Sequence, residues 1–150
     1  MADLVFTASS SLISLVAATP KTLLQLKAPA NQRVKILGWG VYFNGQNADA
    51  QHVVVRLLRQ TDDGTMSGAA AEKVDASIAE TVQTVARENA SVEPAAGSIL
   101  CRKQIHPKNG YEENPPDPGK EYKIPAGGRL AIEVNAPAAV DAVAWFRAEE

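Results

Sequence analysis

The sequence predicts an all-β protein, an antiparallel β-sandwich of about eight or nine strands in a jelly-roll arrangement. Apolar and polar residues alternate with a period of two along most of the chain, which is typical of half-buried strands. Turn signals rich in Gly, Asn, Asp and Pro separate these stretches at intervals of about 8 to 14 residues. Strand patterns do not alternate with helix patterns, so the sequence argues against the parallel sheet of a βαβ fold.

The clearest alternation is in "GGRLAIEVNAP", where Leu130, Ile132 and Val134 share one face. We expect these three in the core, and Arg129 and Glu133 toward solvent or a neighbouring chain. Ile132→Ala should then cost about 2–5 kcal/mol, and Glu133→Ala well under about 1 kcal/mol. The stretches "KTLLQLKAP", "QHVVVRLLRQ" and "GSILCRKQIHP" predict further inward side chains, namely Leu24, Leu26, Val53, Val55, Leu57, Ile99, Cys101 and Ile105.

The stretch "RVKILGWGVYFNG" at residues 33–45 changes phase inside one strand. Val34 and Ile36 share one face, whereas Leu37 and Trp39 begin the opposite alternation. A change of phase within a strand predicts a β-bulge near Ile36 and Leu37.

Three dipeptides mark turns between the predicted strands. Asn44-Gly45 is a hairpin signal between the strand before it and the next strand along the chain. Asp63-Gly64 marks the following turn, and Gly127-Gly128 marks a tight turn before the strand that contains Ile132.

Residues 69–89 leave two interpretations open. Val74, Ile78 and Val82 recur at a spacing near four, as on an amphipathic helix, and the Ala and Glu content also favours helix. Residues 82–86 alternate as a strand as well. We expect one helical turn at residues 76–80, then a strand to about Glu88, and less than about one-fifth helix in the whole chain.

Length and composition indicate a single globular domain over residues 1–150. The 150 residues can bury one sizeable core, and the net charge of −2 argues against a nucleic-acid-binding protein. The N-terminal stretch lacks the basic start of a signal peptide and no apolar run is long enough for a membrane helix, so we expect a soluble, unprocessed chain that binds no membrane. One cysteine excludes an intrachain disulfide.

The sequence contains no catalytic constellation, so we expect a non-enzymatic protein without a cofactor or metal. His52 and His106 are its only histidines, and they have no partners at the spacing of a zinc site. Cys101 follows the apolar alternation, which favours a packing role. Glu112 and Glu113 are adjacent in a proline-rich loop, where carboxylates are usually solvated.

Two segments are candidates for partner contact. The loop "HPKNGYEENPPDPGKEY" is stiffened by its prolines and carries Tyr111, which suits protein recognition. The N-terminal segment, residues 1–10, offers Asp3, Leu4, Val5 and Phe6 as a strand that could pair with another chain. The alternative is that residues 3–6 form a strand of their own sandwich and that Tyr111 covers a core edge.

The runs "TPKTLLQLKAPANQRVKILGWGVYFNGQNADAQHVVVRLLRQTDDGTMS" and "HPKNGYE…YKIPAGGRLAIEVNAPAAVDAVAWFRAEE" resemble small structural proteins of tailed bacteriophages and prophages. The resemblance covers most of residues 19–150 and weakens between residues 69 and 89. It implies a capsid decoration (cementing) protein that binds the major capsid protein of an icosahedral head as a homo-oligomer, with a trimer favoured. It implies synthesis in the host cytoplasm, a final place on the virion surface and no defined site residues. The alternatives are a carbohydrate-binding or adhesion module, which the aromatic content of 5% disfavours, and a small hydrolase.

Overall fold

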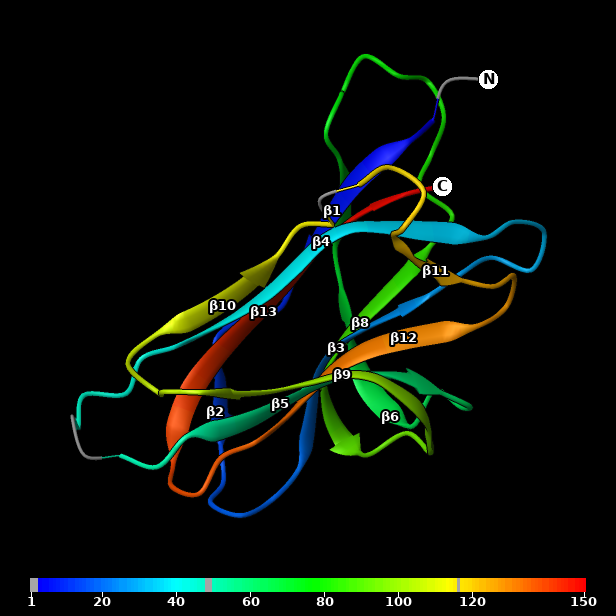
Figure 1. The fold of residues 1–150 in the computed structure, drawn as a ribbon. Coiled ribbons are helices and arrows are strands. Elements are labelled where there is room, and N and C mark those ends of the chain that lie inside the picture. Colours follow the sequence, from blue (N-terminus) through cyan, green and yellow to red (C-terminus); the bar gives the residue numbers. More distant parts are fainter. Residues whose placement is uncertain (1–2, 48–49, 116) are drawn as a thin grey trace.

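The computed structural model describes residues 3–47, 50–115 and 117–150, which form two stacked antiparallel sheets (Figure 1). Strands make up 57% of the described residues, far above the globular average, and these residues contain no helix. The predicted all-β sandwich and the predicted low helix content are therefore confirmed. The described residues form thirteen strands, more than the eight or nine expected.

The seven-stranded sheet, sheet A, has the order β10-β4-β13-β1-β7, with β11 also paired to β4 and β2 also paired to β13. Its strands are β1 (Val5–Ser9), β2 (Ile13–Leu15), β4 (Val34–Phe43), β7 (Ala71–Lys73), β10 (Gly110–Glu113), β11 (Tyr122–Ile124) and β13 (Val140–Glu149).

The six-stranded sheet, sheet B, has the order β6-β8-β3-β12-β5-β9. Its strands are β3 (Lys21–Lys27), β5 (Val53–Gln60), β6 (Thr65–Ala69), β8 (Val85–Val92), β9 (Ala96–Ile105) and β12 (Arg129–Asn135).

Eight strands pair in the nested order of a jelly roll, namely β1, β3, β4, β5, β9, β10, β12 and β13. In that series the first strand pairs with the last, the second with the seventh, the third with the sixth and the fourth with the fifth. The other five strands, β2, β6, β7, β8 and β11, add to the sheet edges, which explains the larger number of strands.

The predicted bulge in β4 is confirmed. Arg147 of β13 is opposite Gly38 and Ala148 is opposite Ile36, so Leu37 is the extra residue. The bulge brings the two apolar series of β4 onto the same side of the sheet. Ile36 before the bulge and Trp39 after it are both fully buried in the core.

The predicted hairpin at Asn44-Gly45 is wrong. The strands on its two sides, β4 and β5, belong to different sheets and do not pair. The connection crosses from one layer of the jelly roll to the other, and Asn44 bonds β13 instead: its side-chain amide donates to Asp141 Oδ2 at 2.9 Å, and its Oδ1 accepts from the Asp141 N–H at 3.0 Å. A strong local turn signal therefore marks a turn here without a hairpin.

The predicted helical turn at residues 76–80 is also wrong, because the segment between β7 and β8 is a loop. Val74 is 54% exposed whereas Val82 packs against the core, so the three spaced apolar residues do not share one buried face. The loop is held by hydrogen bonds instead: the Lys73 ammonium donates to the Ile78 carbonyl at 2.6 Å, and the Glu150 carboxylate accepts from the N–H groups of Gln83 and Thr84. The predicted strand is confirmed but shifted, since β8 begins at Val85 and ends at Val92.

The inward positions of β12 are confirmed, and the prediction for Glu133 is wrong. Leu130, Ile132 and Val134 are buried between the sheets. Glu133 points to the other face of sheet B, yet it is only 6% exposed, and its carboxylate forms an ion pair with Arg56 on the neighbouring β5. Strand β12 is central, so its outer side chains are covered by their own neighbours.

A polar cluster lies on the same outer face, beside the buried Leu58 and Ala131. Gln25 Nε2 donates to Gln60 Oε1 at 2.6 Å, and Gln60 Nε2 donates to Thr22 Oγ1 at 2.9 Å. The Glu93 carboxylate accepts from both the N–H and the hydroxyl of Thr22. Gln25 and Thr22 are fully buried, so these hydrogen bonds take the place of bonds to water, although Gln25 Oε1 has no hydrogen-bond partner among the described residues.

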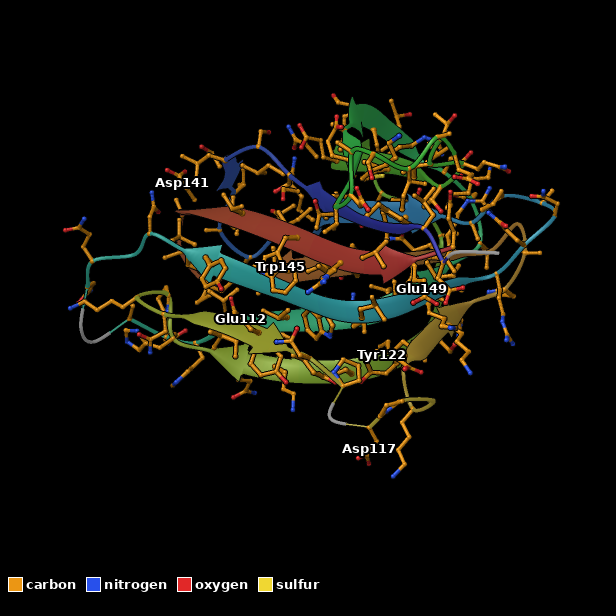
Figure 2. All side chains as sticks on the ribbon, turned by 90° about the horizontal axis from the view of Figure 1, so that it is seen from above. Glu112, Asp117, Tyr122, Asp141, Trp145 and Glu149 are labelled. Atoms are coloured by element: carbon orange, nitrogen blue, oxygen red, sulfur yellow. The ribbon has the colours of Figure 1, made fainter. Side chains whose placement is uncertain are left out.

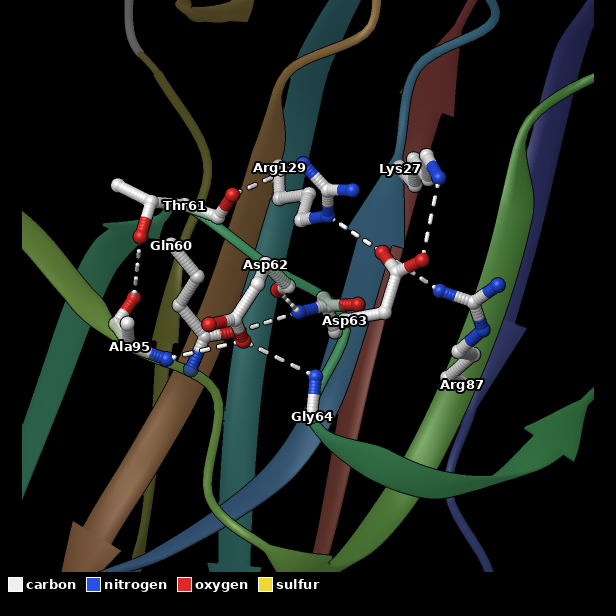
Figure 3. A network of polar contacts seen from close by, with 10 residues as sticks. Lys27, Gln60, Thr61, Asp62, Asp63, Gly64, Arg87, Ala95 and Arg129 are labelled. Atoms are coloured by element: carbon white, nitrogen blue, oxygen red, sulfur yellow. Dashed lines mark hydrogen bonds and ion pairs between the residues drawn. The ribbon is translucent and has the colours of Figure 1, made fainter.

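Asp63 ties three strands of sheet B together at one end (Figure 3). Its carboxylate pairs with Lys27 of β3 at 3.1 Å, with Arg87 of β8 at 2.7 Å and with Arg129 of β12. The Arg129 hydrogen bond, followed by the Lys27 hydrogen bond and the charge of Arg87, holds the pKa of Asp63 well below its usual range. The predicted turn at Asp63-Gly64 thus positions an electrostatic link between strands.

Candidate interaction surface

The structure places the predicted N-terminal contact residues largely inside the chain's own fold. Phe6 is fully buried and Leu4 is 5% exposed, whereas Val5 is half-buried and Asp3 is exposed. Strand β1 pairs with β13 on one side and with β7 on the other, so its backbone offers no free edge. Leu4 and Phe6 are therefore not the apolar anchor for a partner that the sequence predicts. Residues 1–2 of that segment lie outside the described residues.

Tyr111 lies on β10, with one side against the core. Its ring centre is 5.3 Å from that of Trp39, and the Lys103 ammonium lies 5.4 Å from the centre of the Tyr111 ring. Partner contact by Tyr111 remains a prediction, and only the half of the side chain that stays exposed is available for it.

Glu113 closes the base of the proline-rich loop. Its two carboxylate oxygens accept hydrogen bonds from the hydroxyls of Tyr111, at 3.1 Å, and Tyr122, at 3.0 Å. Burial, and then the bond to Glu113, raise the pKa of Tyr122 to about 12. Because Glu113 ends β10 and Tyr122 begins β11, this pair holds together the two ends of the connection between these strands.

The titratable groups of the described residues do not assemble a recognisable metal or nucleophile site. No group of three His, Cys, Asp or Glu side chains in the described part of the chain could hold a metal ion. His52 and His106 form an edge-to-face pair with ring centres 5.7 Å apart. Burial raises the pKa of the half-buried Cys101 thiol, which disfavours the reactive thiolate. Within the described ranges, no helix is long and apolar enough to cross a membrane.

The outer face of sheet A carries an aromatic surface that the sequence analysis missed. We call it the aromatic face and define it by Tyr42, Val143 and Trp145, with the two glycines Gly40 and Gly110 beneath the rings. Figure 2 looks onto this sheet, with Trp145 near the boundary of β13 and β4 and Glu112 on the β10 side. The side chains alternate along each strand, so Ala144 and Phe146 beside Trp145 are buried in the core.

Trp145 lies flat on the sheet because its cross-strand neighbour is a glycine. Trp145 is opposite Gly40. A Cβ atom on Gly40 would lie 2.7 Å from Cε2 of the indole and even closer to Nε1, so any larger residue would lift the ring off the backbone. One side of the indole thus packs on the backbone of β4, and the other side faces outward.

Tyr42 lies over a glycine in the same way, two residues beyond Gly40 on β4. It is opposite Gly110 of β10, and a Cβ atom on Gly110 would collide with its ring. Tyr42 is also opposite Val143 of β13 and remains 41% exposed. Two aromatic side chains therefore project from the same face of sheet A, at diagonal positions on the neighbouring strands β4 and β13.

Charged residues border the aromatic face. Glu112 of β10 is opposite Gly40 of β4, and Arg147 of β13 is opposite Gly38 of β4. Both charged side chains are exposed. Among the described residues, neither side chain forms a hydrogen bond or an ion pair. Asp141 at the start of β13 is already engaged: its carboxylate accepts from Asn44 and Ser14, and these bonds lower its pKa.

The sequence does contain signals for this face. Tyr42 falls between Val41 and Phe43, and Trp145 falls between Ala144 and Phe146, so alternation places both aromatics on the outside of the sheet. A glycine inside a strand also marks close approach by another group. Their juxtaposition could not be predicted, because the pairing of β4 with β13 joins residues about one hundred positions apart in the chain.

Comparison with protein-family models, with curated proteins and with solved structures gives no match for this chain.

Proposed function

We propose that the chain is a non-enzymatic structural protein of a phage virion, a capsid decoration protein that stabilises an icosahedral head by binding the major capsid protein. The observation that carries this proposal is the aromatic face, a flat apolar surface of the kind that proteins bury against other proteins. Tyrosine and tryptophan are also the residues that contribute most to such contacts.

The resemblance to phage structural proteins supports the proposal from a second direction. The resembling runs, residues 19–67 and 106–150, contain β4, β10 and β13, the strands beneath the aromatic face. The sandwich and the loop whose ends are joined by the Glu113–Tyr122 hydrogen bond also suit a protein held in a lattice, because little conformational order has to be gained on binding.

The experiment is to purify phage particles from the cells that encode the chain and to identify their proteins by mass spectrometry. The chain should sediment with the particles in a fixed ratio to the major capsid protein. Particles from a strain without this gene should lose their DNA at a lower temperature. A chain that is present in the lysate but absent from washed particles would refute the proposal.

A second candidate function, carbohydrate binding, is favoured by one observation. The rings of Tyr42 and Trp145 lie flat on the sheet with their outer sides open, which is a geometry that can stack against a sugar ring. Affinity electrophoresis in gels containing bacterial polysaccharides tests this alternative. Retardation of the wild type that Trp145→Ala removes would support it, and unchanged mobility in every gel would exclude the polysaccharides used.

A further inference from the structure

We propose that the aromatic face binds the same face of a second copy of this chain, so that the protein forms a twofold homodimer through the outer side of sheet A. This inference rests on the proposed function in one respect, because it takes the aromatic face to be a protein contact. It goes further in naming the occupant and the residues that join the two copies.

The centre of the contact is apolar and flat. Tyr42 and Val143 are cross-strand neighbours, and Trp145 lies two residues beyond Val143 on the same face of β13. On the β1 side, the outward residues are Thr7 and Ser9, opposite Arg147 and Trp145, and their short side chains leave the aromatic centre unobstructed. A flat sheet face of this kind can be covered by another flat sheet face.

The charged residues beside the aromatic face could pair with those of a second copy. Glu112 and Arg147 project from the same face, on strands β10 and β13, and the chain supplies a partner to neither side chain among the described residues. One face therefore presents an unpaired acid and an unpaired base on the two sides of β4. A second copy brings the opposite charge for each of them, so Glu112 of each copy can pair with Arg147 of the other.

The surroundings of the rings fit a protein better than a small ligand. Binding sites for small ligands are usually concave, with polar groups directed at the ligand. The structure has a hollow of about 400 Å³ beside Pro107 and Ala138 and one of about 650 Å³ beside Arg56 and Arg102, and both lie away from the aromatic face. The nearest carboxylate on β13, that of Asp141, is already engaged by Asn44 and Ser14.

The test is a charge swap read out as molar mass by sedimentation equilibrium over a wide concentration range. The wild type should sediment at twice 15.9 kDa, because a face that covers the same face of a second copy joins two copies about a twofold axis. The trimer that the resemblance favours would need a second, different contact surface. Arg147→Glu and Glu112→Arg should each weaken association about 10- to 100-fold, because each places like charges together. The double variant Glu112→Arg/Arg147→Glu restores opposite charges and should recover most of the association.

Two controls separate association from folding. Arg102→Glu makes the same charge change at an exposed position on sheet B and should leave the molar mass unchanged. The melting temperature of each variant shows whether the fold is intact. Because Glu112 and Arg147 are exposed and unpaired within the chain, their reversal should leave the monomer folded.

The outcomes distinguish this inference from the proposed function. A wild type that stays monomeric at all concentrations and shows no contact between copies on particles overturns the inference, even if the chain sediments with particles. An oligomer that both single variants leave intact overturns it as well. Rescue by the double variant supports it, whether or not the chain is found on particles. Polysaccharide binding by a monomeric wild type, lost in Trp145→Ala, would assign the face to carbohydrate instead.

Discussion

The two sheets differ most on their outer faces. On sheet B, polar and charged side chains turn outward and yet are covered: Gln25, Gln60 and Glu133 are at most 6% exposed, and each has a partner within the chain. On sheet A, the outward side chains at the centre are aromatic, and Tyr42 remains 41% exposed. At the centre of sheet B the outward polar side chains therefore bond to groups of the same chain, whereas at the centre of sheet A aromatic surface stays open. Among its described residues, sheet B exposes large apolar side chains only on β8 and β9, at Val85, Val92 and Ile99.

This difference tells us where stability and interaction are located. Buried polar groups are costly unless they are paired, so the outer face of sheet B must be kept intact for the chain to fold. Exposed aromatic surface contributes little to the folded monomer and gains most of its value when another molecule covers it. Variants on the two faces should accordingly separate loss of stability from loss of association.

The largest loss of stability should come from a substitution in the core between the two sheets. Phe6→Ala should lower the free energy of unfolding by about 3–5 kcal/mol, because it removes a fully buried ring from β1. Thr7→Ala is the matched control on the next residue, which is exposed, and should cost less than about 1 kcal/mol. Urea unfolding measures both. Equal values would mean that β1 is only loosely attached to the sandwich.

The second prediction concerns the covered face. Glu133→Ala should cost roughly 3 kcal/mol, because it leaves the partly buried guanidinium of Arg56 without its carboxylate. Glu133→Gln keeps the size and one acceptor and should cost less. This expectation replaces the small effect that alternation alone predicts. If Glu133→Ala is as mild as a surface substitution, the outer face of sheet B is open to water after all.

The third prediction uses pH at the end of sheet B. Asp63→Asn should cost about 1–3 kcal/mol at neutral pH, because three cations lose their charged partner. The pKa of Asp63 is lower in the folded state, so its stabilisation is complete above the unfolded pKa of about 3.9. This stabilisation is lost as the pH falls from the unfolded pKa through the folded pKa of Asp63. The difference between wild type and variant should therefore narrow below about pH 3 in urea melts.

The smallest effect on stability should be on the open face. Tyr42→Thr should change the free energy of unfolding of the monomer by less than about 1 kcal/mol, because the exposed ring has only cross-strand contacts to lose. The same substitution should weaken association if the aromatic face joins two copies. Unfolding measured at dilutions where the chain is monomeric provides the comparison. A cost equal to that of Glu133→Ala would remove the contrast between the two faces.

Local sequence patterns predicted much of the fold and little of the interaction surface. The alternation in β12 identified Leu130, Ile132 and Val134 as core residues, and the change of phase in β4 identified the bulge at Leu37. These features depend on residues that are close in the sequence, so the local pattern of apolar and polar residues is enough to predict them. The error at Asn44-Gly45 arose because the strands on its two sides pair with partners distant in the chain, and the error at residues 76–80 arose where the segment is largely exposed.

The sequence by itself determined the class of the fold, because a period of two can bury one side of a strand only if a second layer covers it. It also determined which side chains of β4 and β13 point outward. Only the tertiary structure decided that Trp145 would lie over Gly40 and Tyr42 over Gly110, and that Glu133 would be buried beside Arg56. The physical reason is that strand pairing in a jelly roll joins the first strand to the last, so residues that share a surface are set by the order of strands in the sheet.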